Sequence, residues 1–112
     1  MIRVAFAHIR PEKEERLRAW LLELATRRAE VLETFRAEGV RHEQVFVIAS
    51  DSGPMLVYAI EAENNEAASK AYAKSMFAID REHRAVLNEC LLDRMKVAPL
   101  FECALADADG KP

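Results

Sequence analysis

Two neighbouring segments are apolar on both of their faces, and this pattern restricts the fold more than any other feature of the chain. Residues 45–49 read Val-Phe-Val-Ile-Ala, and residues 55–60 read Met-Leu-Val-Tyr-Ala-Ile. Successive residues of a strand point to opposite sides of a sheet, so both sides of these segments are apolar. The turn sequence Asp-Ser-Gly-Pro at 51–54 lies between them. We therefore predict an antiparallel hairpin, with strands at 44–50 and 55–62, that needs a cover on both faces.

Length and composition limit the chain to one small folded domain. Its 112 residues have the length of a single domain, and 51% of them are hydrophobic while 31% are charged. This composition is typical of a folded protein rather than of a disordered tail. Nucleic acid is not expected as the main partner, because the net charge is -3 and the isoelectric point is about 5.6. The longest apolar run, at 55–60, is too short to span a membrane.

The two cysteines and the N-terminus bear on location. Cys90 and Cys103 do not have the spacing of a metal or redox motif. The first residues contain no long apolar stretch and no cleavage pattern, so no signal peptide is expected. We expect a cytoplasmic protein with two free thiols.

Two further elements are predicted in the first half of the chain. Residues 2–9 alternate as a strand does, with the even-numbered side chains on one face and the odd-numbered ones on the other. Residues 12–38 carry apolar side chains at steps of three and four, which predicts one long helix that ends at Gly39. The polar triplet at 41–43 is interpreted as a solvated loop.

The second half of the chain predicts two helices and a last strand. Asn64 or Asn65 is expected to cap the first of these helices, and Asp80 the second. Residues 96–105 are interpreted as the final strand. Pro99 restricts this strand to an edge of the sheet, because proline cannot donate a hydrogen bond to a ladder.

The resulting order of elements, β-α-β-β-α-(α)-β, is that of the ferredoxin-like α+β fold. We expect a four-stranded antiparallel sheet with helices on one face, a single domain over residues 1–105, and a flexible tail at 106–112. The helices cover one side of the two-sided apolar strands, and a second copy of the chain is the simplest cover for the other. The alternative is that the tail, or the loop near residue 77, folds across that face.

Several segments resemble the dimeric α+β barrel superfamily: the start at 1–6, the long charged helix, the stop at 38–40 and the hairpin. This group includes cofactor-free monooxygenases, haem-degrading enzymes, stress-responsive barrel proteins and rhamnose mutarotases. The segment Ile-Asp-Arg-Glu-His-Arg at 79–84 is similar to one in an uncharacterised bacterial family of about this length. The resemblance implies a homodimer with a pocket between sheet and helices in each subunit. Rhamnose mutarotases carry a catalytic histidine in the first helix, whereas residues 12–38 here contain no histidine.

The main candidate for a catalytic pair is Asp80 with His83. A carboxylate beside an imidazole can fix its tautomer and hold it as a general acid or base. The alternative is structural, with Asp80 capping the helix and His83 packed at its start. The pair would need further ligands to hold a metal ion, so no metal site is expected.

Four other residues are candidates for substrate binding. Tyr58 can offer a hydroxyl to a substrate, or pack its ring in the core or at a dimer interface. His8 is interpreted as the floor of a pocket or as a residue at the rim of the core. Trp20 is a candidate apolar wall that also suits the core, and Arg28 would bind an anionic group or reach to solvent.

The sequence leaves two functional hypotheses. One is a pocket that binds or transforms a small metabolite without an organic cofactor, for example by isomerisation or oxygenation. The other is a non-enzymatic homodimeric module that binds a ligand or serves a structural role. The sequence contains no glycine-rich phosphate loop, G-x-S-x-G or H-E-x-x-H motif that would favour a particular enzyme class.

Overall fold

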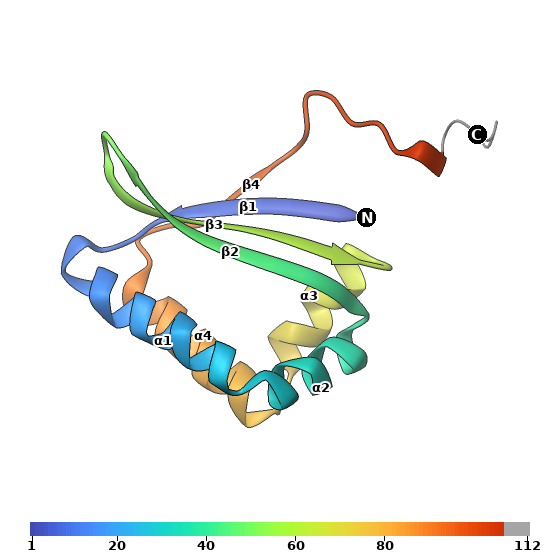
Figure 1. Cartoon of the computed structure of the whole chain (residues 1–112), viewed down its shortest axis with the longest axis horizontal. Coiled ribbons are helices and arrows are strands. Elements are labelled where there is room, and N and C mark those ends of the chain that lie inside the picture. The colour runs from blue at the N-terminus through green and yellow to red at the C-terminus, as the bar shows by residue number, and fades with distance from the viewer. Residues whose placement is uncertain (107–112) are drawn as a thin grey trace.

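The computed structural model describes residues 1–106, and within them it confirms the ferredoxin-like α+β fold. Figure 1 shows one sheet with the helices gathered on one of its faces. The strands pair antiparallel in the order β2-β3-β1-β4. The elements in chain order are β1 Ile2–His8, the 3-10 helix η1 Pro11–Lys13, α1 Glu14–Thr26, α2 Arg28–Glu38, β2 Val40–Ser50, β3 Gly53–Ala62, α3 Asn65–Lys74, α4 Ala78–Cys90 and β4 Met95–Val97.

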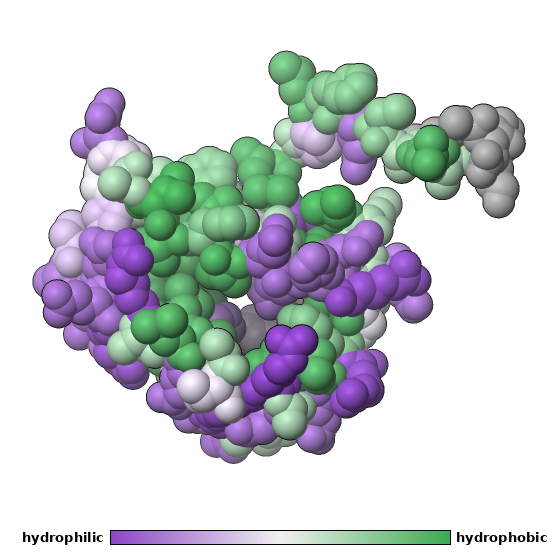
Figure 2. Space-filling view, in the orientation of Figure 1, coloured by the Kyte–Doolittle hydropathy of each residue, from purple (hydrophilic) through white to green (hydrophobic). Residues whose placement is uncertain are grey.

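The odd-numbered residues of β1 face the helices, and the even-numbered ones face away. Ala7 and Ile9 are fully buried against α1 and α4, together with Leu17, Leu56 and Cys90. On the opposite side, Phe6 lies beside Val57 of β3 and Met95 of β4. Figure 2 shows apolar side chains gathered along this outer side of the sheet. The predicted two-sided apolar character of the strands is therefore present, and only one of the two faces is covered.

The single long helix that the spacing predicts over 12–38 is interrupted. A 3-10 turn begins at Pro11, and the helix breaks at Arg27, whose backbone angles of φ -108° and ψ 39° are not helical. The hydroxyl of Thr26 donates to the carbonyl oxygen of Glu23 at 2.7 Å and competes with the helical bonding there. The break lets α1 pack on α4 while α2 packs on α3 and β2.

Two predictions for the second half are corrected and one is confirmed. Asn64 does cap α3, since its Oδ1 accepts a hydrogen bond from the backbone N–H of Ala67 at 2.9 Å. Asp80 does not cap α4, because this helix already begins at Ala78 and Asp80 lies inside its first turn. The last strand covers only Met95–Val97 instead of 96–105, since Pro99 cannot continue the ladder.

The first hairpin strand starts earlier than predicted. β2 begins at Val40 and includes the triplet 41–43 that was interpreted as a loop. A β-bulge between Val40 and His42 inserts Arg41 as an extra residue against β3. Both Val40 and Glu43 consequently face the helices, although they are three residues apart.

Other predictions concern the termini, the thiols and membranes. Except for Ala106, the expected flexible tail at 106–112 lies outside the described residues. Both cysteines are free thiols, with Cys90 buried and Cys103 exposed. In residues 1–106, none of the helices is long and apolar enough to cross a bilayer.

Candidate functional site

A cavity of about 320 Å³ lies between the inner face of the sheet and the helices. Much of its apolar wall consists of side chains from α1 and α2, namely Leu21, Leu24, Val31 and Phe35. Its polar lining consists of Arg3, Thr34, Glu38, Glu43, Tyr58, Asn65, Ser69, Tyr72, Asp80, His83 and Lys96. An apolar cavity with a few convergent polar groups is the usual form of a small-molecule site.

The cavity collects polar atoms that the fold leaves without partners. Within the described residues, five buried side-chain atoms have no hydrogen-bond partner, and all five belong to residues that line this cavity. They are Arg3 Nε, Glu38 Oε2, Asn65 Oδ1, Tyr72 Oη and Asp80 Oδ2. Each such atom costs on the order of 1–3 kcal/mol. Their convergence on one cavity indicates a place prepared for a polar molecule.

Glu38 and Glu43 reach the cavity through features of the backbone. Glu38 is the last residue of α2, and Gly39 follows it with a φ of 75°, a left-handed conformation that ends the helix and turns the chain directly into β2. The bulge at Arg41 then turns Glu43 inward, opposite Ile60 of β3. The two carboxyl groups therefore enter the cavity from either side of one tight turn.

Burial keeps both glutamates protonated up to neutral pH. Desolvation, a hydrogen bond to the Asp80 carboxyl and the charge of that carboxyl together raise the pKa of Glu38 to about 8. Desolvation raises the pKa of Glu43 to about 7, again with a contribution from Asp80, while Arg3 acts in the opposite direction. Near pH 7 the pair can hold a proton on one carboxyl and lack one on the other. This is the state that general acid–base chemistry requires.

Asp80 and His83 project from the first turns of α4, three residues apart on one face. Asp80 is only 7% exposed, and its Oδ2 is without a partner. Trp20 donates from Nε1 to Nδ1 of His83 at 2.8 Å, so neutral His83 carries its proton on Nε2. Burial lowers the pKa of His83 to about 4, against the opposing charge of Asp80. His83 is therefore an uncharged hydrogen-bond donor at neutral pH.

Tyr72 and Arg84 complete this side of the site. The ring of Tyr72 meets that of His83 edge to face, with 6.0 Å between centroids. Burial raises the pKa of Tyr72, so its hydroxyl stays protonated. Arg84 donates to the carbonyl oxygens of Tyr72 at 2.6 Å and Ser75 at 2.7 Å, which ties the end of α3 to α4. On the sheet side, Arg3 donates from Nη1 to the hydroxyl of Ser69.

The structure brings together some of the sequence-predicted site residues and separates others. Tyr58, Asp80 and His83 all line the cavity. Trp20 is buried in the core behind it and holds His83 in place. His8 lies on the outer face of the sheet, where Asp93 binds its Nδ1 at 2.9 Å, because the even-numbered residues of β1 point away from the helices.

Arg28 is also outside the cavity. It is exposed at the start of α2, directly after the break in the helix. The break rotates α2 relative to α1, so the apolar stripe that placed Arg28 among core positions does not run through it.

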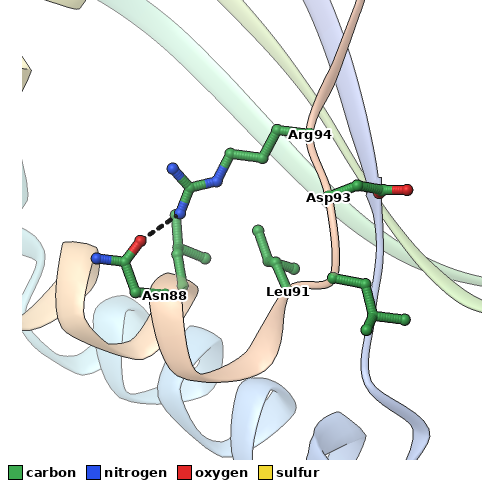
Figure 3. A pocket seen from close by; sticks show the side chains of 6 residues that line it. Asn88, Leu91, Asp93 and Arg94 are labelled. Carbon is green, nitrogen blue, oxygen red and sulfur yellow. Dashed lines mark hydrogen bonds between the residues drawn. The ribbon is translucent and has the colours of Figure 1, made fainter.

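A second hollow of about 310 Å³ lies at the end of α4 and carries fewer signs of a site. Figure 3 shows Arg94 reaching back to Asn88, with the Nη2 to Oδ1 bond at 2.9 Å, while Asp93 points away from both. Asp93 also accepts a hydrogen bond from the backbone N–H of His8 at 2.8 Å. The polar groups of this hollow are thus already paired within the chain.

Sequence reasoning missed Arg3, Glu38, Glu43, Asn65 and Tyr72. Two of them carried a usable signal. Arg3 shares a strand face with Ala5 and Ala7, and Glu38 follows Thr34 by four positions on the buried side of α2. Glu43 lies on the same face of β2 as Val45 and Val47, but both faces of that strand are apolar in sequence, so alternation alone could not identify the inward face. Within residues 1–106, no group of three or more His, Cys, Asp or Glu is arranged to hold a metal ion.

The sequence matches one protein family over nearly its whole length. The family described as "Family of unknown function (DUF6176)" matches residues 2–106. The chain belongs to this family. Among curated proteins, none matches this sequence.

Solved structures of three other proteins share the fold of this DUF6176 member. L-rhamnose mutarotase FA22100 from Formosa agariphila superposes with a TM-score of 0.65 at 8% identity, over 93% of this chain and 99% of its own. Rv0793 from Mycobacterium tuberculosis gives a TM-score of 0.52 at 25% identity, over 92% and 97%. A putative antibiotic biosynthesis monooxygenase from Nitrosomonas europaea gives 0.53 at 14% identity, over 89% and 98%. These similarities agree with the expected fold group, and none of them singles out the segment at 79–84.

Proposed function

We propose that the cavity binds a small uncharged molecule rich in hydroxyl or carbonyl groups, and that Glu38 and Glu43 exchange protons with it. The observation that carries this proposal is the set of five unpaired buried polar atoms, all of which line one cavity. A bound polar molecule would supply the missing hydrogen-bond partners. Binding would then relieve the free-energy cost of leaving these buried atoms unpaired, and this relief would contribute to affinity.

The size of the cavity sets the size of the ligand. Its volume of about 320 Å³ is at the lower end of the range for ligand sites. It equals the liquid volume of roughly ten water molecules. A molecule the size of a monosaccharide fits this limit, whereas a dinucleotide or a haem is too large.

The mixture of donors and acceptors favours hydroxyl groups over an ion. Arg3 Nε can only donate and the Asp80 carboxylate can only accept, while Tyr72 Oη can do both. A hydroxyl group also does both, so a polyhydroxyl compound can satisfy neighbouring atoms of opposite kind. An anion would meet the carboxyl groups of Glu38, Glu43 and Asp80, and an ammonium would leave Arg3 without a partner.

The pKa values of the two glutamates support proton transfer. A general acid or base works best when its pKa is near the working pH. With values of about 8 for Glu38 and about 7 for Glu43, the pair holds one acid and one base near neutrality. Proton transfer of this kind is performed by side chains alone and needs no organic cofactor.

Interconversion of sugar anomers is the reaction class that we would test first. The ionised carboxyl takes the proton of the anomeric hydroxyl, and the protonated carboxyl gives its proton to the ring oxygen. The ring C–O bond breaks with its electron pair going to that oxygen, and a carbonyl forms. Ring closure on the other face reverses both transfers and restores both glutamates. The fold shared with an L-rhamnose mutarotase makes free aldoses a suitable first set of probes.

Exchange between the α and β anomers of each aldose, measured by NMR saturation transfer, tests the proposal. We expect the protein to accelerate exchange for at least one aldose. Glu38→Gln and Glu43→Gln should each reduce the acceleration by about 100-fold or more, which is the usual contribution of a general acid or base. Glu33→Gln is the matched control, since Glu33 is exposed on α2, the same helix as Glu38, and it should leave the rate unchanged.

Two results would contradict the proposal in different ways. An aldose that binds, as shown by a raised melting temperature, but undergoes no accelerated exchange would remove the catalytic step and leave a ligand-binding module. If no aldose and no other neutral polyhydroxyl compound raises the melting temperature, the assignment of the ligand class is wrong.

A further inference from the structure

The imidazole of His83 is held by a hydrogen bond from the core behind the cavity. Trp20 donates from Nε1 to Nδ1 of His83 at 2.8 Å. An indole nitrogen can only donate, so Nδ1 is the acceptor and carries no hydrogen. Trp20 is 4% exposed, and the guanidinium of Arg27 lies over its ring, with Cζ 5.8 Å from the centroid. The group that fixes the tautomer of His83 is therefore itself held in place.

This bond determines what the second ring nitrogen can do. In a carboxylate–imidazole pair that acts as a general base, the carboxylate accepts from Nδ1–H, and Nε2 has the free lone pair. The arrangement at His83 is the reverse, because Nδ1 accepts from the indole and Nε2 carries the hydrogen. While the indole bond is in place, neither nitrogen has a free lone pair with which to take up a proton. The ring is thus built to donate a hydrogen bond from Nε2.

The Nε2–H group is available to a ligand. His83 lines the cavity, and within residues 1–106 its Nε2 has no hydrogen-bond partner. Tyr72 packs edge to face against the same ring, with 6.0 Å between centroids. Burial lowers the pKa of His83 to about 4, so the donor is uncharged near neutral pH. A neutral donor with a fixed direction suits a ligand oxygen that gains negative charge.

His83 also lies close to the acids of the cavity. Asp80 precedes it by three residues on α4, so the two side chains share one face of the helix. The carboxyl of Asp80 forms a hydrogen bond with Glu38, and its charge also acts on Glu43. The Nε2–H donor and the two glutamates therefore surround the same part of the cavity.

We propose that His83 is a further catalytic residue, that its Nε2–H group donates to the anomeric oxygen of a bound aldose, and that Trp20 is the residue that positions it. The role rests on the proposed function. When the ionised glutamate takes the proton of the anomeric hydroxyl, negative charge develops on that oxygen, which becomes the carbonyl oxygen of the open chain. The hydrogen bond from Nε2 is stronger to this oxygen than to the starting hydroxyl, so it lowers the barrier. The Nε2 proton stays on His83 throughout, and both proton transfers remain with the glutamates.

Long-range ¹H–¹⁵N correlation spectra of the wild type test the contact, because they record the two ring nitrogens of each histidine separately. In the free protein, Nε2 of His83 should carry the hydrogen and Nδ1 should not. The probes are D-glucose, D-xylose and L-rhamnose. The aldose whose exchange the protein accelerates most should shift the Nε2 signal. The matching anhydroalditol, which has the same ring without the anomeric hydroxyl, should not. His8 and His42 are internal controls and should not move with either compound.

Two substitutions of His83 separate the donor from the contact with Trp20. In His83→Gln the side-chain amide still donates near the position of Nε2. In His83→Asn the shorter amide reaches only the position of Nδ1, so Trp20 keeps an acceptor and the donor to the ligand is lost. We expect His83→Asn to lower kcat for anomer exchange by about 100- to 1,000-fold with little change in KM, and His83→Gln to stay within about tenfold of the wild type. His42→Asn is the matched control, since His42 is exposed on β2, and its rate should equal that of the wild type.

Trp20→Phe tests the positioning role. Without the indole donor, both tautomers of His83 are available, so the nitrogen spectra should show hydrogen on Nδ1 as well as on Nε2. The variant should lower kcat more than it changes KM, because only part of the protein then presents the Nε2–H donor. A wild-type tautomer distribution in this variant would overturn the role of Trp20.

Two results would overturn the role of His83 and leave the pair of glutamates in place. One is an aldose that the wild type turns over without any shift of the His83 Nε2 signal. The other is a His83→Asn variant that exchanges aldoses as fast as His83→Gln does. The nitrogen spectra are recorded on the wild type, so they decide the question even where a variant fails to fold. If the wild type accelerates exchange of none of the three aldoses, the proposed reaction itself is wrong, and the role of His83 is wrong with it.

Discussion

The protonation state of Glu43 depends on one extra residue in β2. Without the bulge at Arg41, regular alternation from Val40 would turn Glu43 toward the outer face of the sheet. With it, Glu43 lies in the cavity, and burial raises its pKa to about 7. The same cavity lowers the pKa of His83 to about 4. One pocket thus holds acids that keep their protons and a histidine that does not take one.

Glu43→Gln should change how stability depends on pH. The native pKa of about 7 is raised above the unfolded value of 4.5, so the stabilisation from the protonated form is fully present below pH 4.5. It is lost as the pH rises through about 7. Glutamine resembles the protonated acid and does not ionise, so the variant should be the more stable protein at pH 8, by roughly 2–3 kcal/mol. Urea unfolding at pH 5 and pH 8 measures this, with Glu33→Gln as control. Equal pH dependence in wild type and variant would contradict the account.

Trp20→Phe should raise the pKa of His83. The indole donates to Nδ1 only while the imidazole is neutral, so its removal takes away a bond that favours the neutral form. The variant should also lose about 1–3 kcal/mol of stability, since a buried acceptor is left unpaired. NMR titration of the histidine ring protons follows the pKa directly, and His8 and His42 serve as internal controls. An unchanged titration of His83 would show that the bond does not hold its protonation state.

At the scale of single residues, the sequence identified part of the site and missed its acids. Asp80 and His83 were recognisable because they stand three apart in a helix, a spacing that survives an error in the helix start. Glu38 was missed although it follows Thr34 by four positions on the buried side of α2. Glu43 was missed because both faces of β2 are apolar in sequence, so its alternation with Val45 did not identify the inward face.

The break between α1 and α2 shapes the elements around the cavity. A straight helix over 12–38 would be roughly 40 Å long. The bend at Arg27 brings α1 against α4 and α2 against α3 and β2, so that both halves cover the sheet. The Arg27 side chain binds Glu23, Glu30 and Glu82, which joins both halves of the helix to α4. It also lies over the ring of Trp20, with 5.8 Å from Cζ to the ring centroid.

Arg27→Ala should lower stability more than Arg28→Ala does. Arg27 makes all three ion pairs described above, and its neighbour Arg28 is exposed and takes no part in them. These bonds raise the pKa of Arg27 and lower that of Glu30 and Glu82. Thermal melting of the two variants measures the difference, which should shrink in high salt because the charges are exposed. Equal melting temperatures would mean that the bend does not depend on these pairs.

At the scale of elements, most of the fold followed from periodicity. The first strand, the hairpin and the Asn64 cap lie where the pattern placed them, within a few residues. The helix break was not predictable, because Thr26 and Arg27 are compatible with a helix and act through a local hydroxyl bond and distant carboxyl partners. The last strand is short because Pro99 stops the ladder outright and does not merely restrict it to an edge.

The whole molecule has one covered and one uncovered face. The covered face holds the cavity, and the uncovered face is the surface that we expect a second copy of the chain to cover. The division follows directly from strands that are apolar on both sides, the feature from which the fold was predicted. The assembly and the site therefore depend on opposite faces of the same strands.

The melting temperature of the wild type should rise with protein concentration. Association stabilises the folded state by mass action, so unfolding of a dimer depends on the amount of chain present. A variant with Phe46→Asp, which places a charge on the uncovered face of β2, should show a much weaker dependence over the same range. Differential scanning calorimetry at concentrations a hundredfold apart makes this comparison. A wild-type melting temperature independent of concentration would argue against the pairing.

The central claim is that the cavity holds an acid–base pair poised at neutral pH, and NMR titration of the glutamate side-chain carboxyl carbons tests it most directly. Uniformly ¹³C-labelled wild type should show two glutamates that titrate near pH 7 and 8. Glu38→Gln and Glu43→Gln should each remove one of these two signals. If every glutamate titrates below about pH 5, the cavity does not hold its acids protonated and the proposed chemistry is wrong.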